Sequence, residues 1–122
     1  MKPSDLETMK TPWATVWNAV ARQVHAIAKD HGFWPEDGRN DLEIMALIHS
    51  EISEAVEALR MGNGGKHHSN TIPWHSVIEE ELADAIIRIM DYGIAHALDI
   101  PNAMVSKMIY NIGRPHKHGK VY

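Results

Sequence analysis

Two pairs of carboxylates, each with its members three residues apart, are the part of the sequence best suited to chemistry. Glu51 and Glu54 form the first pair, and Glu81 and Asp84 form the second. Residues three apart lie on the same face of a helix, so each pair would project two neighbouring carboxylates. If the two helices pack antiparallel, the four carboxylates converge. Oxygen ligands without cysteine or an obvious histidine partner suit a hard cation, with Mg²⁺ as the first choice and Mn²⁺ as an alternative.

The helix expected around Glu51 is amphipathic. At about 100° per residue, its apolar side chains fall on one arc, which consists of Leu47, Ile48, Ile52, Ala55, Ala58 and Leu59. Glu51 lies in the middle of this arc, and Glu54 lies at its edge. Because an ionised carboxylate away from water costs several kcal/mol unless a cation or hydrogen-bond donors meet it, Glu51 needs a partner.

The second acidic helix is expected from about His75 to Leu98. Its buried arc would consist of Ile78, Leu82, Ala85, Ile86, Ile89, Met90 and Tyr92. Glu81 borders this arc, and Asp84 lies farther out on the same flank. Arg88 follows Asp84 by four residues, so an ordinary ion pair within the helix is the alternative to a ligand role for Asp84.

Capping signals place the remaining elements in one all-α domain over residues 1–122. Thr11 before a proline starts the first helix, and Asp99 caps the last. The expected helices span about 11–32, 40–60, 75–98 and 99–113. The ends, 1–10 and 115–122, are expected to be flexible, and the glycine-rich segment 61–74 is expected to be a mobile loop.

The composition of the chain limits which partners it is expected to bind and in which compartment it is expected to work. A net charge of −4 disfavours binding to duplex nucleic acid. The absence of cysteine excludes a disulfide framework and a thiolate zinc site. It also means that no disulfide pattern indicates secretion. No run of about 18 apolar residues is present to span a membrane. A cytoplasmic protein is therefore expected, and a homodimer or homotetramer would help a helical chain of this size to bury apolar surface.

Lys107, Asn111 and Arg114 share one face near the end of the last helix, at offsets of four and seven residues. Cations at this end also suit the helix dipole, which is the structural alternative to a binding role. Lys117 lies in the basic tail that follows, which in an assembly could reach a polyphosphate. Trp34, in the connector 33–40, could either cover a planar ligand or cap the end of the bundle.

Three motifs together resemble the MazG-type all-α nucleoside triphosphate pyrophosphohydrolases, relatives of dimeric dUTPases and of phosphoribosyl-ATP pyrophosphohydrolase. The motifs are Glu51-x-x-Glu54, Glu81-x-x-Asp84 and Lys107-x-x-x-Asn111-x-x-Arg114, within a match that covers roughly Gly32 to Lys120. The resemblance implies a four-helix core completed by a partner subunit, Mg²⁺ held by the four carboxylates, and triphosphate contacts from the third motif. The implied reaction is cleavage of a nucleoside triphosphate, a dNTP or a non-canonical NTP, between the α and β phosphates to give a nucleoside monophosphate and pyrophosphate.

Several members of this family carry a tyrosine four residues after the final acidic ligand, where this chain has Arg88. Arg88 would then reach a phosphate or stay in an ion pair, and the base preference is left open. Trp34 and Lys117 are the other expected nucleotide contacts. Glu54 would take the proton of the attacking water, and Glu51 is the second candidate catalytic carboxylate.

Two other classes of helical protein lack their motifs in this sequence, and a third class is the main alternative. A ferritin-like di-iron bundle needs Glu-x-x-His pairs, which the sequence lacks. An HD-type phosphohydrolase would need adjacent His and Asp, which are also absent. The main alternative is a non-enzymatic helical oligomer, an interaction module whose acidic flanks are only solvated faces and salt bridges between subunits.

Overall fold

The computed structural model describes residues 1–121, and all of its regular structure is helical. The helices are α1 (Pro3–Glu7), α2 (Lys10–Asp30), α3 (Asp41–Arg60), α4 (Val77–Ala95) and α5 (Ile100–Ile112), with two 3₁₀ turns, η1 (Asn63–Gly65) and η2 (His116–Gly119). Within these residues no strand forms, although His68 and Ser76 make an isolated β-bridge. The all-α prediction is confirmed. None of the helices described combines the length and the apolar character that crossing a membrane requires.

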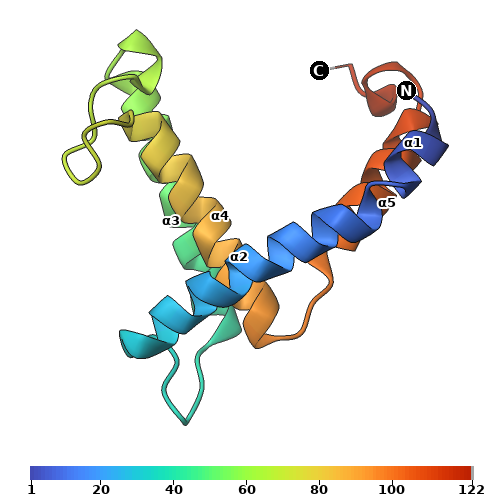
Figure 1. Cartoon of the computed structure of the whole chain (residues 1–122). Helices are drawn as coiled ribbons and strands as arrows, with labels where there is room; N and C mark the ends of the chain where they lie inside the picture. The colour runs from blue at the N-terminus through green and yellow to red at the C-terminus, as the bar shows by residue number, and fades with distance from the viewer. Residues whose placement is uncertain (122) are drawn as a thin grey trace.

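Helix α4 is the centre of the arrangement. It packs against α3 on one side and against α2 on the other, while α5 packs on α2 and α1 packs on α5. Figure 1 shows the result: α3 and the first part of α4 form one arm, and α2, α5 and α1 form another. The main apolar cluster joins α2 to α4 through Trp17, Ala21 and Met90.

The starts of α3, α4 and α5 follow their capping residues, but the predicted start of the first helix at Thr11 is wrong. Helix α2 begins at Lys10, after Met9, and has no side-chain cap. The side chain of Asn40 accepts hydrogen bonds from the backbone N–H groups of Leu42 and Glu43 at 2.9 and 3.1 Å. Asp99 caps α5 in the same way, as the sequence predicted. Helix α4 begins at Val77 rather than near residue 75, because Ser76 and Glu79 form a reciprocal capping box there.

Two features near the ends of the longer helices were not predicted. The short helix α1 precedes α2, and its Leu6 is buried. The segment between α3 and α4 is tied to α4 through Ser69, whose hydroxyl donates to Glu80 at 2.5 Å and accepts from the backbone N–H groups of Thr71 and Ile72 at 3.1 Å. Thr71 donates a second hydroxyl bond to Glu80. Side chains of the loop therefore satisfy a carboxylate of the helix.

The buried arcs predicted for the two acidic helices are only partly buried in the single chain. On α3, Ala55 and Ala58 are buried, but Ile52 and Leu59 are about half exposed. On α4, Leu82 and Ile86 are also exposed, at 45% and 48%. The reason is that α3 packs on α4 alone among the longer helices, so one flank of its apolar arc has no helix over it.

Candidate metal centre and adjoining cleft

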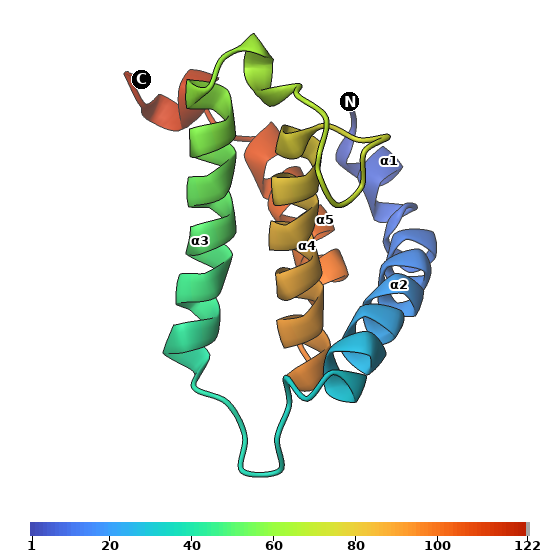
Figure 2. The ribbon, with the colours of Figure 1, turned by 90° about the vertical axis from the view of Figure 1, so that its left-hand side faces the viewer.

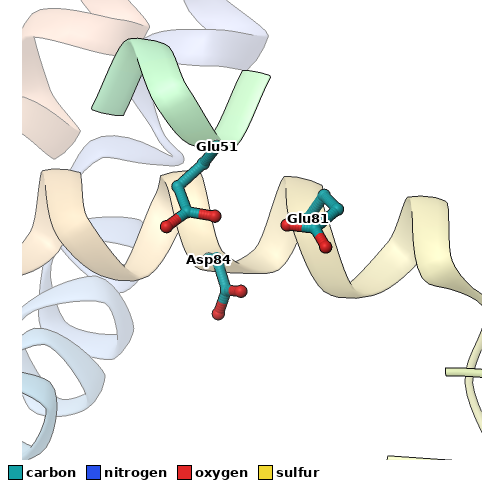
Figure 3. Close-up of side chains that lie close together, drawn as sticks. All are labelled: Glu51, Glu81 and Asp84. Atoms are coloured by element: carbon teal, nitrogen blue, oxygen red, sulfur yellow. The ribbon is translucent and has the colours of Figure 1, made fainter. Parts of the chain in front are cut away.

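Three of the four predicted carboxylates meet where α3 packs on α4. Glu51 projects from α3, and Glu81 and Asp84 project from α4, so that the three side chains gather on one face of the pair (Figure 3). One carboxylate oxygen from each lies within 4.8 Å of the other two. Ala55 on α3 and Ala85 on α4 are both buried, and small side chains at buried positions allow packed helices to approach closely.

Glu54 lies beside this group rather than within it. Its side chain is exposed on α3, and its oxygens are not part of the three-residue cluster. Its carboxylate is nevertheless a neighbour of Glu81. Burial, together with hydrogen bonding and repulsion from Glu54 and then from Glu51, raises the pKa of Glu81 to about 8 from its ordinary value of 4.5.

The crowding of negative charge also affects Asp84. Burial and the nearby charges of Glu51 and Glu80 raise the pKa of Asp84 above its ordinary value, although the charge of Arg88 opposes this rise. Oε2 of Glu51 and Oε2 of Glu81 are buried and have no hydrogen-bond partner within the described chain. A hard divalent cation fits this donor set, because it would both satisfy the two orphaned oxygens and offset the repulsion.

Arg88 pairs with Glu51 and not with Asp84. Its Nε donates to Oε1 of Glu51 at 2.9 Å, and the Glu51 side chain is only 9% exposed. The ion pair between Asp84 and Arg88, the alternative to a ligand role for Asp84, was inferred from spacing along one helix and does not form in residues 1–121. The observed partner comes from the neighbouring helix and is the more deeply buried carboxylate, which gains more from a cation.

A cleft of about 380 Å³ opens beside the carboxylates, and Glu51, Asp84 and Arg88 line it. Apolar side chains of α2 and α4, among them Ile27 and Ile87, form much of its wall. This volume lies in the range of small-molecule sites, which are typically apolar with a few polar groups at fixed positions. The candidate metal centre thus borders a cavity of the size of a small ligand.

Trp34, a predicted nucleotide contact, is engaged with the protein itself. Its indole N–H donates to both carboxylate oxygens of Asp91, at 2.8 and 2.9 Å, and Nδ1 of His25 lies 2.7 Å from Asp91. The guanidinium of Arg39 sits 5.0 Å from the centre of the Trp34 ring. Asp91 and Arg39 line the cleft, whereas Trp34 does not.

Sequence reasoning missed Asp91, which is only 8% exposed. At about 100° per residue, Asp91 lies on the same flank of α4 as Asp84, away from the predicted apolar arc. The criterion that singled out Glu51, a carboxylate in the middle of an apolar arc, therefore did not apply to Asp91. Arg39 offered no comparable signal, because it lies in the connector between α2 and α3.

The predicted phosphate contacts of α5 are not brought to the carboxylates within one chain. Lys107 and Arg114 both lie over Tyr110, 4.4 and 5.6 Å from its ring centre, and Arg114 also donates to the carbonyl of His118. Oδ1 of Asn111 is buried without a partner. In residues 1–121 no hydrogen bond or ion pair joins these side chains, or the exposed Lys117, to the carboxylate cluster, and Figure 1 shows α5 in the other arm.

No protein-family model, curated protein or solved structure matches the chain.

Proposed function

We propose that this protein is a Mg²⁺-dependent nucleoside triphosphate pyrophosphohydrolase of the MazG type, which cleaves between the α and β phosphates to give a nucleoside monophosphate and pyrophosphate. One observation carries the proposal: three carboxylates from two helices converge, with two buried oxygens lacking partners, at the edge of a cleft of about 380 Å³. Such an arrangement costs stability in the free protein, and sites of this kind are typical of ligand-binding function.

The residues divide into roles by their position. Glu51, Glu81 and Asp84 would hold the cation, because their oxygens lie within 4.8 Å of one another. When bound, Mg²⁺ supplies neutralisation of phosphate charge and activation of water. Glu54, exposed beside Glu81, would accept the proton of the attacking water. Arg39, in the cleft wall, would bind a phosphate through two donors at once.

The α5 residues take part in this proposal only through a second copy of the chain. Lys107, Asn111 and Arg114 would then face the carboxylates of a partner in a homodimer or homotetramer. Large apolar side chains left exposed on α3 and α4, such as Val56 and Ile86, support such an assembly, because burying them would be favourable.

Release of pyrophosphate from a panel of NTPs and dNTPs, with and without Mg²⁺, tests the activity. We expect Asp84→Asn and Glu51→Gln to abolish Mg²⁺-dependent release. The matched control is Glu57→Gln, an exposed carboxylate on α3 outside the cluster. Unchanged turnover in the two cluster variants would contradict the assignment of the site.

The exposed apolar side chains also favour a second candidate, a non-enzymatic helical oligomer that acts as an interaction module. That protein would gain no thermal stability from Mg²⁺ together with a non-hydrolysable nucleoside triphosphate. A thermal-shift measurement with these two additions separates the candidates, since the enzyme would be stabilised by binding both.

A further inference from the structure

Arg88 forms an ion pair with Glu51, one of the three carboxylates proposed to hold the metal. Its Nε lies 2.9 Å from Oε1 of Glu51, while Oε2 of Glu51 has no partner within residues 1–121. The bond crosses from α4 to α3, and the arginine side chain is 35% exposed and borders the cleft. The guanidinium of Arg88 is thus a partly buried cation that contacts the carboxylate cluster and also lines the cleft.

We propose that Arg88 is a displaceable counter-cation: it holds Glu51 until a divalent cation takes its place, and its released guanidinium then binds an anionic ligand in the cleft. The inference rests on the proposed function in taking these carboxylates to hold a divalent cation. It adds an order of events, in which the metal binds first and the anion second, and it assigns Arg88 a direct contact with the anion.

Arg88 and a divalent cation would compete for Glu51 because both are positively charged. A guanidinium and a divalent cation that share Glu51 would lie within a few ångströms of each other, and like charges at that separation repel strongly. Removing the arginine charge therefore strengthens metal binding. At about 5 Å in water, the repulsion between charges of one and two units corresponds to a change in affinity of roughly tenfold.

The charges around the cleft explain why the anion would bind second. Its lining includes three carboxylates, Glu51, Asp84 and Asp91, and two guanidinium groups, Arg39 and Arg88. With one net negative charge among these groups, the cleft repels an anion. A divalent cation offsets this charge together with that of Glu81, the third proposed ligand, so the repulsion is removed.

The guanidinium of Arg88 is free to change partners. Within the described part of the chain, its only hydrogen bond runs through Nε to Glu51. The two terminal nitrogens make no bond there to another side chain. A phosphate could therefore bind these two nitrogens without displacing another protein partner.

The experiment measures the affinity of Mn²⁺ alone by isothermal titration, with Arg88→Gln as the main variant. Glutamine removes the charge but keeps a donor for Glu51, so the fold is preserved, and circular dichroism checks this. Arg88→Lys retains a charge in the same place. Arg60→Gln is the matched control, because Arg60 is an exposed arginine on α3 whose ion pair with Glu57 lies outside the cluster.

We expect R88Q to bind Mn²⁺ about tenfold more tightly than the wild type, with R88K and R60Q close to the wild type. A purely structural arginine would not give tighter binding on removal. We also expect inorganic pyrophosphate to bind the Mn²⁺-saturated R88Q protein at least about tenfold more weakly than it binds the Mn²⁺-saturated wild type, because one charged phosphate contact is lost.

Two results would overturn the inference in distinguishable ways. If the wild type binds Mn²⁺ and R88Q binds it no more tightly, Arg88 is a fixed partner of Glu51, and the metal centre stands without it. If neither protein binds Mn²⁺, the metal centre of the proposed function fails as well.

Discussion

Replacing Glu81 with glutamine should change how the stability of the protein depends on pH. The pKa of Glu81 is raised to about 8 in the folded chain from an ordinary value of 4.5. Between these values the folded chain retains a proton that the unfolded chain has already released. Stability therefore falls as the pH rises from about 4.5 to about 8. Glutamine cannot ionise, so this part of the decline should be absent in E81Q.

The size of the effect follows from the spacing of the carboxylates. Their oxygens lie within 4.8 Å of one another. At that separation two unit charges repel by about 1 kcal/mol in water and about 3.5 kcal/mol at an effective dielectric constant of about 20. Because Glu81 is partly open to solvent, we expect a value in the lower part of this range. E81Q should match the wild type at acidic pH and be more stable above the pKa of Glu81. Repulsion between the carboxylates, after screening by solvent, contributes about 1 to 2 kcal/mol of this difference, and the burial of the charged Glu81 side chain adds to it.

Urea unfolding followed by circular dichroism, at fixed protein concentration and with a chelator present, measures this difference at a series of pH values. Glu57→Gln is the control, because its exposed side chain pairs only weakly with Arg60 and should leave the pH profile unchanged. Identical pH profiles for the wild type and E81Q would show that Glu81 does not carry the perturbed proton, and the electrostatic account of the cluster would be refuted.

Three further predictions concern other parts of the structure. Mg²⁺ at about 100 times its dissociation constant should raise the stability of the wild type by about 2.7 kcal/mol, measured by urea unfolding, and should do so far less for Asp84→Asn. Ser69→Ala should lower the stability, because Glu80 loses one of its two hydroxyl donors and the backbone N–H groups of Thr71 and Ile72 lose their acceptor, and it should speed hydrogen exchange in residues 66–76; unchanged exchange would argue against the tie between loop and helix. Trp34→Phe removes two hydrogen bonds to the buried Asp91 and should lower the unfolding midpoint in urea, whereas an unchanged midpoint would mean that solvent replaces the indole.

The helices could be predicted largely because their signals are local. Asp99 caps α5 where the sequence indicated, since a cap depends on residues only two or three positions away. Leu82 and Ile52 were expected to be buried and are exposed. Helical periodicity identifies the apolar face, but it does not identify which neighbour, if any, covers that face.

In the candidate site, too, local features could be predicted from the sequence, whereas contacts between helices could not. The inward position of Glu51 was predicted from its place on the apolar arc, and its need for a partner follows from its burial. The identity of the partner, Arg88, could not be predicted, because it depends on the register between α3 and α4. The remote position of Lys107 likewise depends on the direction in which α5 leaves α4, which no local pattern encodes.

The alanines buried along α3 and α4 have an effect beyond packing. Ala55 lies one turn after Glu51, and Ala85 directly follows Asp84. Because α4 is the only long helix that packs on α3, a side chain bulkier than alanine at position 55 would press against α4. It would then change the spacing between Glu51 and the two acids of α4, so the geometry of the candidate metal centre depends on an uncharged residue.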